Sequence, residues 1–228
     1  MSGVAIAKSL LRHIVEGVIL IAILLLVSGR PGWVHAWIYV AFLEVFQFGA
    51  GIYLDRVNPG LMAERSGIRK GTKTYDFFFV AIIAAVGPIA VWVVAGLDVR
   101  SHWPPAVPNT CCIAAFDVCA ASSFFTLWAM AVNRFFAITV RIQTERGHAV
   151  ADTGPYRYVR HPGYIGMIAF TLASPVALGS WRALIPAAVV AVALVVRTAL
   201  EDRTLRAELA GYPDYAARVP QRLVPGLW

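Results

Sequence analysis

The sequence predicts an all-α integral membrane protein with about five to six transmembrane helices and a C-terminal helical tail. Of the 228 residues, 59% are hydrophobic and only 14% are charged, whereas soluble domains carry about 25% charged residues. The mean hydropathy is +0.67. The apolar residues are gathered into six runs, and the basic residues lie mostly in the loops between them.

Each apolar run is a candidate for crossing the bilayer, which takes about 20 apolar residues in a helix. The first four runs are long enough or nearly so. The fifth is short and contains Pro175, so the fifth and sixth form either two full spans or a tight hairpin around residues 179–182. The first run is expected to be a retained helix rather than a signal peptide, because Glu16 interrupts it. The runs are Leu10–Val27, Trp33–Leu54, Tyr75–Leu97, Thr110–Thr139, Tyr164–Leu178 and Leu184–Leu200.

The basic residues have a one-sided distribution. Of the 20 Lys and Arg residues, all but Arg30, Arg100 and Arg182 fall on the same side of the predicted spans. Cytoplasmic loops carry the excess of Lys and Arg in membrane proteins. We therefore expect both termini to lie in the cytoplasm. The net charge of +7 then serves orientation and contact with membrane lipids, and no nucleic-acid partner is expected.

The last 28 residues differ from the spans. Residues 201–210 are charged and favour helix, so they extend the sixth span into the cytoplasm, and Gly211 permits a stop. Beyond it, Tyr212 and Tyr215 belong to a segment that mixes aromatic and apolar residues with Arg218 and Arg222. Such a segment can lie at the membrane interface or close over a site.

Residues 154–164, Gly-Pro-Tyr-Arg-Tyr-Val-Arg-His-Pro-Gly-Tyr, are the densest polar cluster beside an apolar run. Pro162 stands where the fifth helix begins, a position that proline favours. The free backbone N–H groups of a helix N-terminus attract anions, and Arg160 and His161 stand beside them. The alternative is a basic membrane anchor with aromatic belt residues.

A second cluster lies at the end of the sixth run. Arg197 and Glu201 are four residues apart and share a helix face. A surface ion pair there contributes little, but a partly desolvated pair level with the first cluster can hold a polar ligand.

Charged and polar residues also fall inside the spans, where they are candidates for function or for hydrogen bonds between helices. Glu44 and Asp117 are the better candidates for lining a cavity, ahead of His13, Glu16 and Gln47. The three cysteines (Cys111, Cys112 and Cys119) lie in one apolar run and are interpreted as packing residues. Neither a disulfide nor a metal site is predicted.

The run from Gln143 to Gly166 resembles the isoprenylcysteine carboxyl methyltransferase family and its bacterial relatives, which are also related to phospholipid methyltransferases. It carries His148-Ala149-Val150 and Arg160-His161-Pro162-Gly163-Tyr164-Ile165-Gly166. The segment from Arg197-Thr198-Ala199-Leu200-Glu201-Asp202 to Leu227-Trp228 is similar to the same family in order and spacing, with Asp202 where the family usually has Glu. The two segments fall within the last 90 residues or so, and the amino-terminal half matches least.

The resemblance implies a cytoplasmic-side site for S-adenosylmethionine (SAM) and a lipophilic methyl acceptor that arrives from the bilayer, such as an isoprenylcysteine-like carboxylate. It implies that Arg197 faces the acceptor and acts in catalysis with Glu201. Residues 1–140 would then be four helices that shape the acceptor cavity, and residues 141–228 the SAM-binding loop, helical hairpin and tail, within one structural unit. The cofactor-binding set, to which the anion argument adds Arg160, is Gln143, His148, Ala149, Val150, Ala151, Tyr156, Arg160, His161, Pro162, Gly163, Tyr164 and Glu201.

Two other functions remain open at this stage. Membrane sterol or lipid reductases that use NADPH also carry an Arg-His-Pro-x-Tyr-x-Gly-like segment. A non-enzymatic transport or assembly protein would bind neither cofactor, although no broken helix pair or symmetric repeat is visible. Separate titrations with SAM and NADPH discriminate among the three.

Overall fold

The computed structural model describes residues 3–226 and 228, and that part of the chain contains helices and no strand. The order is α1 (Gly3–Ser28), α2 (Val34–Val57), α3 (Leu61–Glu64), α4 (Asp76–Ala81), the π-helical turn η1 (Ile82–Val86), α5 (Gly87–Ser101), α6 (Asn109–Val132), the 3-10 turns η2 (Thr144–Arg146) and η3 (Gly154–Arg157), α7 (Pro162–Ala177), α8 (Leu184–Glu208) and α9 (Tyr212–Arg218). The predicted all-α class is confirmed.

Within the described residues, five helices are long and apolar enough to span a membrane: α1, α2, the continuous α4–η1–α5, α6 and α8. Helix α7 has 16 residues, which at 1.5 Å per residue makes about 24 Å. This is shorter than the roughly 30 Å hydrocarbon core of a bilayer. The protein is an integral membrane protein, and its described residues form five helices of spanning length and the shorter apolar helix α7.

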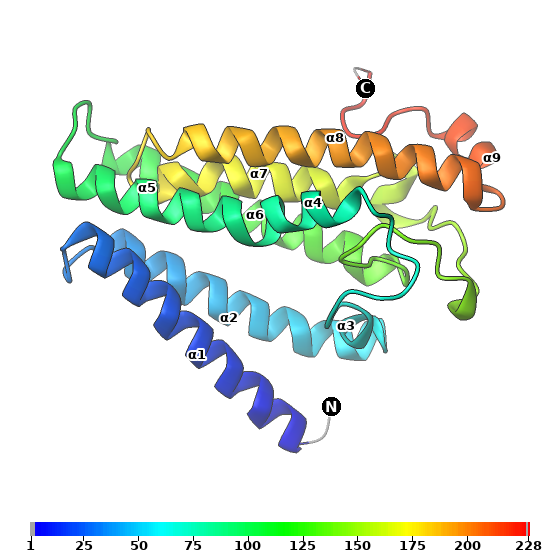
Figure 1. The fold of residues 1–228 in the computed structure, drawn as a ribbon, viewed down its shortest axis with the longest axis horizontal. Helices are drawn as coiled ribbons and strands as arrows, with labels where there is room; N and C mark the ends of the chain where they lie inside the picture. Colours follow the sequence, from blue (N-terminus) through cyan, green and yellow to red (C-terminus); the bar gives the residue numbers. More distant parts are fainter. Residues whose placement is uncertain (1–2, 227) are drawn as a thin grey trace.

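Helices α4–α5, α6, α7 and α8 lie side by side, while the α1–α2 hairpin is inclined to them (Figure 1). Helices α6 and α7 approach each other closely at Gly166. A Cβ atom added there would lie 2.1 Å from Thr126 Oγ1 and 2.7 Å from the Ser122 carbonyl oxygen. Small residues permit such close contact where lipid gives no hydrophobic drive between helices.

Packed side chains form cores at the two ends of the bundle. One core joins α1, α2 and α5 through Leu24, Ala36 and Ala95, all fully buried. The other lies beneath α9, where Tyr212 and Tyr215 pack with Tyr156 of η3. Figure 1 shows that α3, α9 and the loop between α6 and α7 gather at one end of the bundle.

Helix α6 ends at Val132, seven residues before the predicted end at Thr139, so this boundary was wrong. Asn133 stops the helix, and its Oδ1 accepts a hydrogen bond of 2.9 Å from the Phe135 N–H. The residues that follow form hydrogen bonds with residues far away in the sequence: the Val140 carbonyl, for example, accepts a hydrogen bond from the Lys73 N–H (3.0 Å). An apolar run that looks helical in sequence thus becomes an irregular segment with long-range hydrogen bonds.

Candidate functional site

A cavity of about 240 Å³ lies at the end of the bundle where these loops gather. Its lining comes from the α6–α7 segment, from one face of α8, from α4 and η1, and from α7 and α9. The lining residues are Arg65, Val80, Ile83, Ala84, Asn133, residues 135–141, residues 148–151, Tyr156, Arg160, His161, Gly163, Tyr164, Met167, Arg197, Glu201, Leu205, Leu209, Tyr212 and Tyr215.

Helix α8 and the residue after it supply one continuous stripe of this lining. Arg197, Glu201, Leu205 and Leu209 are spaced by four residues, so they share a face. At 1.5 Å per residue the stripe is about 18 Å long. The cavity is therefore elongated along α8, from the membrane-spanning part of the helix to its end.

Arg197 is buried and makes its bidentate contact with Asp76, the first residue of α4. The Nε–Oδ1 distance is 2.6 Å and the Nη2–Oδ2 distance is 3.0 Å. Nη2 also donates to the Ile138 carbonyl at 2.6 Å. The expected Arg197–Glu201 pair was wrong, because Asp76 reaches the guanidinium from another helix. Two parallel hydrogen bonds hold the guanidinium plane in one orientation.

Glu201 takes a different partner. Its Oε2 accepts a hydrogen bond from the Tyr164 hydroxyl at 2.5 Å, and its side chain lines the cavity. Among the described residues no cation lies within 4 Å of this carboxylate. Glu201 is therefore an anionic group that faces the cavity and can receive a cation.

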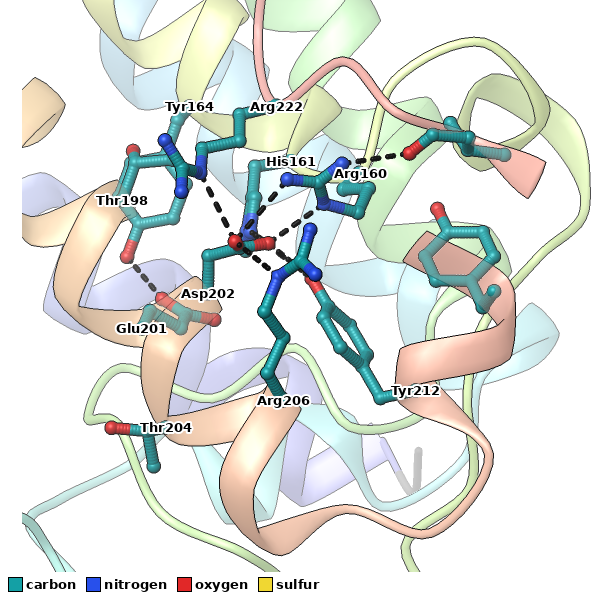
Figure 2. Close-up of polar contacts among 12 residues, drawn as sticks. Arg160, His161, Tyr164, Thr198, Glu201, Asp202, Thr204, Arg206, Tyr212 and Arg222 are labelled. Atoms are coloured by element: carbon teal, nitrogen blue, oxygen red, sulfur yellow. Dashed lines mark hydrogen bonds and ion pairs between the residues drawn. The ribbon is translucent and has the colours of Figure 1, made fainter. Parts of the chain in front are cut away.

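Asp202 is fully buried and accepts hydrogen bonds from several polar side chains behind the cavity wall. It accepts from Arg160 (2.7 and 3.2 Å), Arg206 (3.0 Å) and Arg222 (3.0 Å). Figure 2 shows its carboxylate among these three guanidinium groups and the Tyr212 hydroxyl. His161 Nε2 lies 3.3 Å from Asp202 Oδ1. Asp202 therefore fixes Arg160 and His161 in place.

Arg160 was expected beside a bound anion, but its guanidinium is occupied by protein. Besides Asp202, it donates to the Val219 carbonyl at 2.7 Å. The backbone N–H groups of Arg160 and His161 donate to the carbonyls of Gln221 and Arg222, each at 3.0 Å. The segment around Arg160 thus fastens the C-terminal tail over the site, as the composition of the tail allowed.

The loop at residues 148–151 lines the cavity as a unit. The His148 ring packs on Phe135 with 4.5 Å between ring centroids, and His148 Nδ1 lies 3.2 Å from the Gln143 N–H. Burial, together with nearby Arg141 and Arg146, lowers the pKa of His148 to about 4. His148 is therefore neutral at physiological pH, and its Nδ1 is the acceptor.

Two residues of the predicted site do not line the cavity. Gln143 is fully buried, and its Nε2 donates to the Phe135 carbonyl at 2.9 Å. Pro162 is also fully buried and begins α7, as predicted. Both support residues that do line it, Phe135 in one case and Gly163 in the other.

Gly163 lies so close to the ring of Phe136 that a side chain at this position would have no room. A Cβ atom added to it would stand 2.4 Å from a ring carbon of Phe136. Glycine at this position lets the Phe136 ring pack against the first turn of α7.

Sequence reasoning missed the cavity wall formed by residues 135–141, as well as Asp76 and Arg65. The wall begins where α6 ends, and no local sequence pattern predicted that the helix would end there. Asp76 carried a usable signal, since a carboxylate at the start of an apolar run needs a partner. Arg65 belongs to a basic loop, where one arginine among several gives no sign that it turns inward.

The other ionisable residues of the spans lie elsewhere. Glu44 lines a separate apolar groove between α1 and α2, where His13 Nδ1 lies 3.0 Å from its Oε2 and 3.4 Å from Glu16 Oε2. Asp117 is exposed on α6. Neither Glu44 nor Asp117 is part of the cavity lining, contrary to expectation.

Residues 113–207 match the family model described as Isoprenylcysteine carboxyl methyltransferase (ICMT) family. The matched segment runs from α6 to the end of α8 and includes every residue of the predicted cofactor-binding set. Arg65, Asp76 and the tail beyond α8 lie outside it. Among curated proteins, none matches the chain.

Proposed function

Since the chain belongs to the isoprenylcysteine carboxyl methyltransferase family through residues 113–207, a family of membrane methyltransferases, we propose that it transfers a methyl group from SAM to a lipophilic acceptor. An amphiphile with an isoprenylcysteine-like carboxylate is the acceptor class that we favour. The proposal puts the cavity on the cytoplasmic side of the membrane, as the distribution of Lys and Arg predicts. The resemblance to bacterial relatives of the family suggests that this membrane is a bacterial inner membrane.

One observation carries the proposal: a single cavity has both a polar and an apolar wall. The polar wall is formed by the family's own segment, with His161, Tyr164 and Glu201. The apolar wall comes from the apolar helices, with Ile83 in the spanning helix that begins at Asp76 and Met167 in the shorter α7. A water-soluble cofactor and a bilayer-dissolved acceptor can meet in such a place.

The residues present fit the chemical groups of SAM. Glu201 offers a carboxylate without a cationic partner among the described residues, which suits the α-ammonium group. The aromatic rings of Phe135, Tyr156 and Tyr212 line the same cavity and suit an adenine ring or a sulfonium. His148, being neutral, adds no positive charge against a cationic ligand.

When bound, SAM supplies an electrophilic methyl carbon, which the acceptor's lone pair attacks as the carbon–sulfur bond breaks and the electron pair stays on sulfur. A carboxylate acceptor is already a nucleophile and loses no proton. The chain then has to position the groups and exclude water, and positioning alone can supply about 7–11 kcal/mol. The tail fastened to Arg160 and His161 closes the cavity wall on the cytoplasmic side.

Arg197 orients the acceptor in this scheme. Asp76 and the Ile138 carbonyl fix its guanidinium, and the Tyr164 ring lies 5.7 Å from its Cζ. A guanidinium held this way presents its remaining N–H groups in a fixed direction. We therefore propose that Arg197 contacts the acceptor headgroup and that Glu201 contacts the cofactor.

Calorimetry with purified protein in detergent tests the cofactor assignment. Glu201→Gln keeps the shape and the Tyr164 contact but removes the charge, and we expect SAM affinity to fall about tenfold or more. Glu208→Gln is the matched control, because Glu208 lies on the same helix in an exposed pair with Lys73. Equal SAM affinity in the wild type and Glu201→Gln would reject the assignment, as would binding of NADPH but not of SAM.

The acceptor class is tested separately, by mass spectrometry of a lipid extract incubated with the enzyme and isotope-labelled SAM. The expected product is a labelled methyl ester in the lipid phase. Label that appears only on an amine or a thiol would contradict the carboxylate acceptor and leave the cofactor assignment standing.

A further inference from the structure

Four arginines line the cavity, and three of them are neutralised by protein carboxylates. Arg141 pairs with Glu64 (2.6 Å) and Glu145 (2.8 Å), Arg160 with Asp202 (2.7 Å), and Arg197 with Asp76 (2.6 Å). For the fourth, Arg65, no carboxylate oxygen lies within 4 Å in the part of the chain that the structure describes. The cavity thus contains one arginine without a counter-ion.

Arg65 is held in this position by neutral contacts. Its Nη1 donates to the Phe136 carbonyl at 3.2 Å, and its Cζ lies 5.3 Å from the centroid of the Phe136 ring. The residue ends the short helix α3 and is partly buried. These contacts orient the guanidinium, but they leave its charge uncompensated.

The surroundings make this charge costly. Burial, and after it the positive charge of Arg197, lower the pKa of Arg65 to about 10. Arg65 is only partly buried, but a charge that has lost part of its water without gaining a charged partner is still in an unfavourable position. An anion in the cavity beside Arg65 would supply the missing partner and would lie close to Arg197 as well.

We propose that Arg65 is the receptor for the anionic headgroup of the amphiphilic carboxylate that the proposed function takes as methyl acceptor. The inference rests on the proposed function and adds a residue outside the matched family segment. Arg65 is a positioning residue here: it binds one carboxylate oxygen, while the other is left free to attack the methyl carbon.

The location of Arg65 favours the acceptor over the carboxylate of SAM itself. The charge of Arg197 affects the pKa of Arg65, so the two guanidinium groups lie in the same part of the cavity. Arg197 stands at the membrane end of the α8 stripe, about 18 Å along the helix from Leu209. The apolar lining from Val80 and Ile83 belongs to the spanning helix that begins at Asp76, the partner of Arg197. A carboxylate on a lipid chain reaches this end from the bilayer.

The pairing would also be lost on methylation. Conversion of the carboxylate to an ester removes the charge that Arg65 attracts, so the product should bind more weakly than the substrate. The same residue would therefore favour substrate binding and product release into the bilayer.

The test uses full-length protein in nanodiscs and measures binding, so it does not depend on turnover. The probes are N-acetyl-S-farnesylcysteine and its uncharged carboxamide. We expect the wild type to bind the acid about tenfold or more tightly than the amide. Arg65→Gln should remove this preference, Arg65→Lys should restore part of it, and SAM affinity should stay within about twofold of the wild type in both. Lys70→Gln, the same charge change at an exposed position of the same loop, should change neither.

Each alternative outcome has a defined meaning. Equal binding of acid and amide by the wild type overturns the role of Arg65, as does an acid preference that persists in Arg65→Gln. Loss of SAM affinity in Arg65→Gln overturns it in another way, since Arg65 would then serve the cofactor. Failure of the wild type to bind SAM is a distinct result, because it rejects the proposed function itself.

Discussion

Replacement of Asp202 by Asn tests whether this carboxylate holds the tail over the cavity. Asn has nearly the same size but carries no charge, and its Nδ2 would face guanidinium N–H groups. Arg160, which is 3% exposed, would lose its bidentate partner. Leaving one member of a buried ion pair alone costs about 3–5 kcal/mol.

The other two arginines contribute less, because their side chains are 44% exposed in Arg206 and 31% exposed in Arg222. Exposed pairs are worth about 0–1 kcal/mol each. The expected loss is therefore about 3–7 kcal/mol. In a chain of this size, 1 kcal/mol corresponds to roughly 2–4 °C in melting temperature, so we expect a fall of at least about 6 °C.

Thermal unfolding in detergent measures this loss, with Arg206→Gln as the control that removes only an exposed contact. Hydrogen exchange provides a local readout, since the Arg160 and His161 N–H groups are bonded to the tail carbonyls of Gln221 and Arg222. These two N–H groups should exchange faster in Asp202→Asn. If Asp202→Asn melts within about 2 °C of Arg206→Gln and retains this protection, the reasoning is refuted.

Two further predictions follow from the same wall of the cavity. His148 has a pKa of about 4 in the folded protein and about 6.5 in the unfolded chain, so the unfolded chain binds more protons between these pH values. The free energy of unfolding should therefore fall as pH drops from 6.5 towards 4, and His148→Asn should flatten this part of the profile of melting temperature against pH. Gly163→Ala would bring a Cβ atom to 2.4 Å from a ring carbon of Phe136, so it should lower the free energy of unfolding by about 1–3 kcal/mol and weaken SAM binding. A variant with the melting temperature and SAM affinity of the wild type would show that the Phe136 ring moves freely.

The spans and the motif could be predicted because their signals are local. Apolar runs gave the five helices of membrane-spanning length and the shorter α7, and proline gave the start of α7 at Pro162. Most motif residues line one cavity because they lie in short loops and first turns, where neighbours in sequence are neighbours in space. The four-residue spacing likewise put Arg197 and Glu201 on one cavity-lining face.

Partners of those residues could not be predicted, because they come from distant parts of the chain. Asp76 is 121 residues from Arg197 and displaced the nearer Glu201 as its partner. The end of α6 was missed for a related reason: apolar residues favour helix locally, but hydrogen bonds to Lys73 and Asp76 hold residue 140 in an irregular segment. Tertiary contacts outweighed local propensity in both places.

The hydrogen bonds between residues 160–161 and 221–222 also bear on how the protein is made. During synthesis, residues 160–161 leave the ribosome before residues 219–222. At that stage Arg160 lacks its Val219 and Gln221 partners, and the cavity lacks α9. Nascent chains of increasing length should therefore acquire protease resistance at residues 154–161 only after residues 219–222 have emerged, so this wall of the cavity forms later than the helices that precede it.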